Sequence, residues 1–108
     1  MANFKGENVG IAYFTNPSTE LEGFGKEVDG IMTSVARQAN CRKVNSDYEV
    51  TIVEKMKPQT IPCLIFTDTS GELEHLRLEG NKLNGITVDK VMDIVKDIIH
   101  YNKTKSNG

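Results

Sequence analysis

The side chains with the most distinctive chemistry in this chain are two cysteines, Cys41 and Cys63. A cysteine thiolate can act as a nucleophile, exchange disulfides or bind a metal ion. These two cysteines are far apart in the sequence and form no Cys-x-x-Cys pair. A small chain with so few cysteines is typical of a reducing compartment, because small secreted domains usually carry a denser disulfide framework. We therefore expect a cytoplasmic protein.

The other side chains that could bind metal or catalyse a reaction form no convincing constellation. His75 and His100 have no cysteine or carboxylate at metal-ligand spacing, so both are expected to face solvent. Glu20 with Glu22 is better explained as part of a solvated acidic surface than as a catalytic pair. The chain has neither a P-loop nor a G-x-G-x-x-G motif. The motifs therefore predict no metal and no cofactor, and they favour a non-catalytic protein over an enzyme.

Length and composition indicate one ordinary globular domain. The chain has 108 residues, is 38% hydrophobic and 26% charged, and carries a formal net charge of −2. This balance gives no attraction for nucleic acid. The longest apolar run is much shorter than a membrane span, and the polar beginning of the chain is unlike a signal peptide. We expect neither a nucleic-acid partner nor a membrane.

The first predicted helix is marked by capping residues and an apolar stripe. Asn16 or Ser18 can serve as its N-cap, and Thr19 with Glu22 has the spacing of a capping box. The apolar stripe continues at steps of three and four residues until about Gln38. Its members are Leu21, Phe24, Val28, Ile31, Met32 and Val35.

The remaining apolar patterns alternate between strand and helix. Compact apolar or alternating runs predict strands, and capping residues followed by periodic apolar positions predict helices. Strands are expected at 8–14, 41–45, 61–67 and 72–78, and further helices begin near residues 46 and 87–89. The resulting order is β-α-β-α-β-β-α, which predicts a four-stranded mixed sheet with helices on both faces. A single domain at 1–102 would be followed by a disordered tail at 103–108.

Three segments of the sequence resemble the thioredoxin family. They are "KVNSD" at 43–47, "TIPCLIF" at 60–66 and "SGELEHLRLEG" at 70–80, and the match extends from about Val9 to Ile99. The resemblance implies the shortened, glutaredoxin-like form of that α/β fold. It also implies a cis peptide bond before Pro62, with the backbone of Ile61 facing an extended peptide.

The chain departs from the thioredoxin pattern where that family does its chemistry. Residues 18–21, Ser-Thr-Glu-Leu, stand where thioredoxins have Cys-x-x-Cys, and Ala12 replaces the buried acid. Without a nearby thiol, Lys43 is expected to be a surface or strand-end lysine. The family's strand order places Cys41 and Cys63 on opposite sides of the first strand, too far apart for a disulfide. Ordinary thiol–disulfide oxidoreductase activity is therefore not expected.

Three functions follow from these observations. The first is a redox-inactive, thioredoxin-like module that binds a protein partner through the cis-proline loop and the start of the first helix. The second is a monothiol redox protein or sensor that uses Cys63 or Cys41. The third is a small structural subunit of a larger assembly. The candidate partner-binding residues of the first function are Asn16, Pro17, Ser18, Thr19, Thr60, Ile61 and Pro62.

Overall fold

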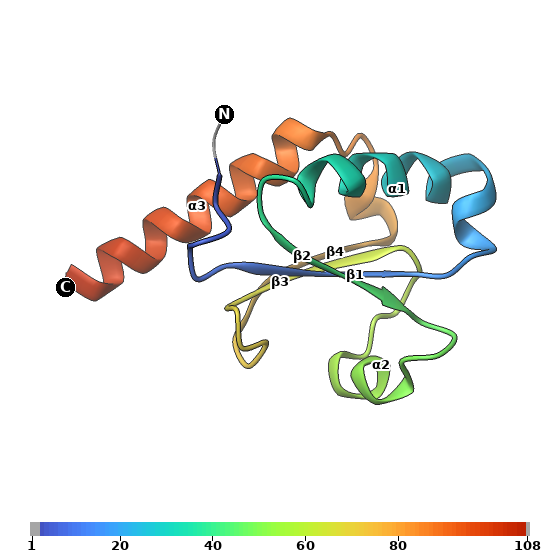
Figure 1. The fold of residues 1–108 in the computed structure, drawn as a ribbon, viewed down its shortest axis with the longest axis horizontal. Helices are drawn as coiled ribbons and strands as arrows, with labels where there is room; N and C mark the ends of the chain where they lie inside the picture. Colours follow the sequence, from blue (N-terminus) through green and yellow to red (C-terminus); the bar gives the residue numbers. More distant parts are fainter. Residues whose placement is uncertain (1–2, 108) are drawn as a thin grey trace.

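Four strands form one mixed sheet at the centre of the molecule (Figure 1). The structure, a computed structural model, describes residues 3–107. The strand order is β2-β1-β3-β4, with β1 parallel to β2 and antiparallel to β3, and with β3 antiparallel to β4. The predicted α/β fold class, with its order of elements, is confirmed. The strands are β1 (Gly10–Thr15), β2 (Asn40–Asn45), β3 (Cys63–Thr67) and β4 (Glu74–Glu79).

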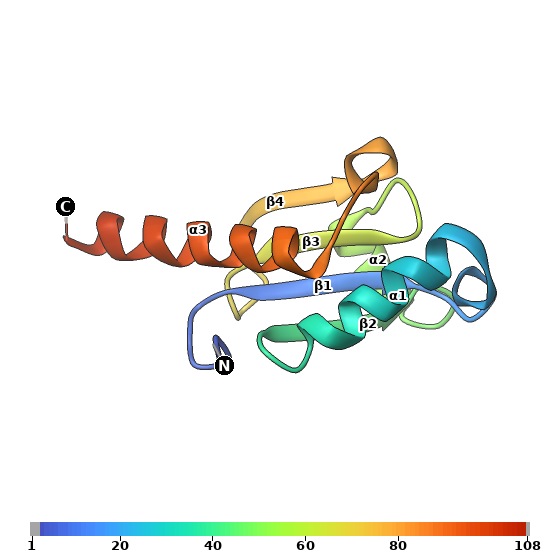
Figure 2. The same ribbon diagram turned by 90° about the horizontal axis from the view of Figure 1, so that it is seen from above.

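Helices cover both faces of this sheet. The helices α1 (Gly23–Val35) and α3 (Val88–Asn107) lie on one face, and α2 (Val50–Met56) lies on the other (Figures 1 and 2). Two short 3₁₀ turns, η1 (Thr19–Leu21) and η2 (Gly80–Leu83), complete the fold. The crossover from β1 to its parallel neighbour β2 therefore runs over α1, as parallel pairing requires.

The alternation of side chains along β1 divides the core into two layers. Ile11 and Tyr13 point to the larger layer beneath α1 and α3, whereas Phe14 belongs to the smaller layer beneath α2. All five residues of β3 are buried, as expected for a strand covered on both faces. Burying each large apolar side chain contributes about 1.5–3 kcal/mol relative to leaving it exposed. The two layers thus hold α1, α2 and α3 against one rigid sheet.

The first helix begins later than the sequence predicts. Glu22 is extended, with φ −159° and ψ 168°, and Gly23 has a φ of 65°, so η1 is separated from α1. No side-chain cap forms at Glu22, and the predicted capping box with Thr19 is absent from the described residues. Leu21 and Phe24, predicted to lie on the buried stripe, are 75% and 39% exposed. The break rotates these two residues away from the core.

The C-terminal helix is longer than the sequence predicts. α3 continues through Asn107, so residues 103–107 are helical where a disordered tail was expected, and Gly108 lies outside the described residues. The Asn102 side chain donates a hydrogen bond to the Asn8 carbonyl oxygen at 3.5 Å, and Lys103 forms an ion pair with Glu7 at 3.7 Å. These contacts tie the last turns of α3 to the segment before β1. They are long-range contacts, which explains why local sequence patterns did not predict them.

Candidate interaction site

The predicted binding residues gather at one end of the sheet. β1, β2 and β4 end there and β3 begins there, as the pairing of Phe14 with Cys63 and of Cys63 with Glu79 shows. The segment 16–22 follows β1, the segment 46–49 follows β2, and the segment 57–62 precedes β3. The fold therefore brings together the two groups of candidate residues, 16–19 and 60–62, that are remote in the sequence.

The turn after β1 is organised by Asn16. Its Oδ1 accepts hydrogen bonds from the Thr19 backbone N–H at 2.9 Å and from the Ser18 hydroxyl at 3.0 Å. Its amide nitrogen donates to the Ser46 hydroxyl at 3.4 Å, which links this turn to the turn after β2. Pro17 and Ser18 are exposed. Asn16 thus holds the turn that leads into η1 rather than the start of α1, and residues 16–19 form a fixed turn ahead of the first helix.

This turn rests closely on α1. Gly25 is buried, and a Cβ atom there would collide with the carbonyl oxygen of Thr19. Only glycine allows this close approach, because it has no side chain. The position of the turn therefore depends on Gly25.

An ionic network lies behind the turn. Lys43 Nζ lies 2.6 Å from Glu20 Oε1 and 3.0 Å from Asp29 Oδ1. The Tyr13 hydroxyl donates to Asp29 Oδ1 at 2.9 Å, and the Thr15 hydroxyl lies 3.4 Å from Glu20 Oε2. Lys43 is therefore a bridge between η1 and α1, a role that the sequence did not reveal.

The charges of this network shift the pKa values of its members. The hydrogen bond to Glu20, and then that to Asp29, raise the pKa of Lys43 above its ordinary value. Burial opposes ionisation of Asp29, but hydrogen bonds from Lys43 and Tyr13 outweigh it and lower the pKa of that carboxyl. Burial, with Asp29 beside the ring, raises the pKa of Tyr13. Near neutral pH Lys43 is therefore an ammonium, Asp29 a carboxylate and Tyr13 a neutral phenol.

The proline loop forms the other side of the site. The Ile61–Pro62 peptide bond is cis, Pro62 is buried, and Thr60 is exposed. The loop is held by the end of β4: the Gly80 N–H donates to the Thr60 hydroxyl at 2.9 Å, and the Gln59 N–H donates to Glu79 Oε2 at 2.8 Å. Within residues 3–107, the backbone N–H and carbonyl of Ile61 have no hydrogen-bond partner. Both groups are therefore available to a bound peptide.

Exposed apolar side chains accumulate at this end of the sheet. Leu21 is 75% exposed, Tyr48 is 79% exposed and Val50 is 52% exposed. They come from η1, from the turn after β2 and from the first residue of α2. A hollow of about 380 Å³ lies beside them, lined by Thr15, Pro17, Glu20, Lys43, Asn45 and Glu49. The site thus offers apolar projections beside a polar hollow.

Both cysteines lie in surroundings that disfavour the thiolate. Cys63 is fully buried beneath α2, and its thiol lies 3.6 Å from Glu79 Oε2. Burial and the neighbouring Glu79 carboxylate raise the pKa of Cys63 to about 12. Cys41 is half-buried on the opposite face, where burial raises its pKa to about 11. The two are free thiols in β2 and β3, with β1 between them, as predicted.

Across residues 3–107, no three or more His, Cys, Asp or Glu side chains come together in a group that could hold a metal ion. No helix in that part of the chain is long and apolar enough to cross a membrane. A larger hollow of about 490 Å³ lies on the α2 face and is lined in part by Gly10, Ala12 and Thr67, away from the proline loop.

Solved structures with similar folds include several thioredoxins. The germline-specific thioredoxin Deadhead from Drosophila melanogaster aligns with a TM-score of 0.64 at 16% identity, over 86% of this chain and 83% of its own. A thioredoxin from Trypanosoma brucei brucei aligns with a TM-score of 0.61 at 25% identity, over 83% and 77%. Chloroplastic thioredoxin z aligns with a TM-score of 0.63 at 18% identity, over 85% of this chain and 79% of its own. No family model matches the chain, and no curated protein matches it. The resemblance predicted from the sequence is confirmed as a shared fold.

Proposed function

We propose that this chain, which has the thioredoxin-like fold, is a redox-inactive protein that binds an extended segment of a protein partner. The binding surface consists of the proline loop at 60–62, the turn at 16–19 and the exposed apolar side chains next to them. The partner binds without reduction or oxidation of a disulfide. We expect this to take place in the cytoplasm, because the composition favours a reducing compartment.

The unpaired backbone of Ile61 is the observation that carries this proposal. Residue 61 lies two positions before the first residue of β3, and neither its N–H nor its carbonyl has a partner within residues 3–107. An extended peptide that aligns with residue 61 can satisfy both groups, in the manner of strand addition. The apolar side chains of Leu21 and Tyr48 would then contact side chains of the peptide on either side of that pairing.

The chemistry at the turn supports binding rather than thiol exchange. Where thioredoxins have their two cysteines, this chain has hydroxyl, carboxylate and apolar side chains, of which Glu20 is bound to Lys43. The two thiols elsewhere have raised pKa values, and the thiolate is the reactive form of cysteine. Neither Cys41 nor Cys63 therefore has the low pKa that a monothiol enzyme needs at neutral pH.

Differential capture from the native host tests this proposal. Tagged wild-type protein should retain a partner that is lost from the Leu21→Glu and Tyr48→Glu variants, because a charge at either exposed position opposes apolar contact. Thr33→Glu is the control, since Thr33 is also exposed but lies near the C-terminal end of α1, away from this surface. The variants should unfold at the same temperature as the wild type. Capture that is equal for all four proteins would reject this surface.

A disulfide-reduction assay addresses the redox half of the proposal separately. The wild-type protein should reduce insulin disulfides no faster than the background reaction with dithiothreitol. Catalysed reduction that disappears in the Cys63→Ser or Cys41→Ser variant would instead support the monothiol function.

A further inference from the structure

The C-terminal half of α3 overhangs the sheet at the end opposite the proposed binding surface (Figure 1). A helix of 20 residues is about 30 Å long, whereas a strand of six residues spans about 20 Å. A hollow of about 450 Å³ lies between the overhanging helix and the start of β4. Leu73, His75 and Tyr101 line this hollow, which we call the α3 ledge.

Apolar side chains lie exposed in the α3 ledge and on β4 beside it. Leu73 is 51% exposed, Leu76 is 39% exposed and Tyr101 is 56% exposed. Within the described part of the chain β4 pairs with β3 alone, so its outer edge is free beside them. Neighbouring apolar side chains and an open strand edge are features that mark a protein-binding surface.

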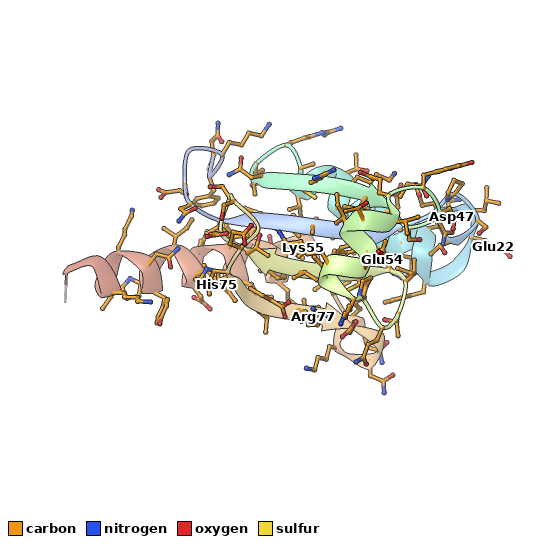
Figure 3. All side chains as sticks on the ribbon, turned by 90° about the horizontal axis from the view of Figure 1, so that it is seen from below. Glu22, Asp47, Glu54, Lys55, His75 and Arg77 are labelled. Atoms are coloured by element: carbon orange, nitrogen blue, oxygen red, sulfur yellow. The ribbon has the colours of Figure 1, made fainter. Side chains whose placement is uncertain are left out.

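A buried polar atom in the ledge also lacks a partner. His75 was expected to face solvent, but it is half-buried, and its Nε2 atom is buried without a hydrogen-bond partner (Figure 3). The cause is a register shift of β4 opposite Phe66 and Thr67, which interrupts the alternation of side chains. A buried nitrogen without a hydrogen-bond partner destabilises the protein, and a polypeptide that covers it with a suitable group relieves this cost.

The charges of the ledge indicate which polypeptide covers it. Asp97 stands one helical turn before Tyr101, and Lys105 stands one turn after it. All three line the hollow, and neither Asp97 nor Lys105 has an ion-pair partner within residues 3–107. When two copies of such a helix pack antiparallel about a two-fold axis at Tyr101, Asp97 of each copy faces Lys105 of the other. The pattern is therefore complementary to itself.

We propose that the α3 ledge binds a second copy of this chain. The two α3 helices pack antiparallel with their Tyr101 side chains at the two-fold axis, and two Asp97–Lys105 ion pairs form across the interface. The exposed side chains of Leu73 and Leu76 in each copy lie beside the helix contact, and dimerisation removes part of their surface from solvent. A two-fold interface of this kind closes as a dimer, because the same patch is used on both copies. Since the contact is small, we expect a dissociation constant in about the micromolar range.

Charge-reversal complementation tests the proposal on the full chain. Sedimentation equilibrium should show a monomer–dimer equilibrium for the wild type. Asp97→Lys and Lys105→Asp should each raise the dissociation constant about tenfold or more, since each places like charges opposite one another twice. An equimolar mixture of these two variants should recover dimers, because every pair across the mixed interface is then opposite in charge. The double variant Asp97→Lys with Lys105→Asp should also dimerise as the wild type does.

Matched surface variants control for net charge. Lys96→Asp changes the charge as Lys105→Asp does, but residue 96 lies about 140° around α3 from Tyr101. Glu27→Lys changes the net charge by the same amount as Asp97→Lys, but residue 27 lies on α1, away from the α3 ledge. Both should dimerise like the wild type, and thermal unfolding should show that all variants are folded. A wild type that stays monomeric at its highest soluble concentration, or a mixture that associates no better than its separate components, overturns the proposal.

Discussion

Substitution of Gly25 by alanine tests how the turn at 16–19 is held in place. An alanine in place of glycine inside a helix usually stabilises a protein by about 0.5–1 kcal/mol. At position 25, however, the added methyl group would collide with the carbonyl oxygen of Thr19. A backbone carbonyl cannot swing aside as the end of a long side chain can, and overpacking of this kind typically costs about 1–3 kcal/mol. We therefore expect Gly25→Ala to destabilise the protein by up to about 2 kcal/mol.

Gly30 supplies the internal control for this experiment. It lies in the same helix, and a Cβ atom there would meet no atom within 4 Å. Gly30→Ala should therefore show the helix-propensity gain alone and stabilise the protein by about 0.5–1 kcal/mol. The difference between the two variants isolates the collision with Thr19, at about 1–3 kcal/mol.

Thermal and urea unfolding followed by circular dichroism measure this difference. For a domain of this size, the melting temperatures of the two variants should differ by at least about 4 °C, with Gly25→Ala lower. If Gly25→Ala were as stabilising as Gly30→Ala, the turn would not rest on α1 in the way described. Gly25→Ala should also weaken partner capture, because the turn is part of the proposed binding surface, whereas Gly30→Ala should not.

Two further predictions concern titrating groups. In native protein near neutral pH, Cys63 should react with an aromatic disulfide reagent only on unfolding. Cys41 should react roughly a hundredfold more slowly than free cysteine, because burial raises the pKa values of both thiols. Fast labelling of either thiol would contradict the burial described. Asp29 has a lowered pKa in the folded state, so its contribution to stability is fully present above the ordinary carboxyl value of 3.8 and is lost as the pH falls through the lower folded value. The urea midpoint should therefore fall more steeply below pH 3.8 for the wild type than for Asp29→Asn. Parallel curves for the two proteins would show that the ion pair with Lys43 contributes nothing to stability.

The element order and sheet were predictable because local patterns agreed with one another. Apolar runs at β1 and β3 alternate with capped, periodic helical segments, and the segments around Lys43 and Pro62 resemble thioredoxin at matching spacing. The fold then brought the two predicted groups of binding residues to one end of the sheet. Their role in partner binding stays a prediction.

What the sequence did not reveal depends on contacts between distant residues. The break between η1 and α1 is stabilised where Thr19 meets Gly25, which overrides the capping box that Thr19 and Glu22 would make. The network around Lys43 joins side chains from β1, η1, α1 and β2, and no spacing in the sequence indicates that they meet. Similarly, an alternating strand pattern gave no sign of the register shift that turns His75 inward.

Arg77 couples two parts of the chain that would otherwise be independent. From β4, its guanidinium donates to the carbonyl oxygens of Met56 at 2.8 Å and Lys57 at 3.0 Å, at the end of α2, and it also pairs with Glu74 (Figure 3). Because these carbonyls gain this donor only when the hairpin of β3 and β4 is closed, the short α2 is completed by the edge of the sheet. A ligand or substitution that displaces β4 would therefore remove this donor and fray the C-terminal end of α2, even without contacting that helix.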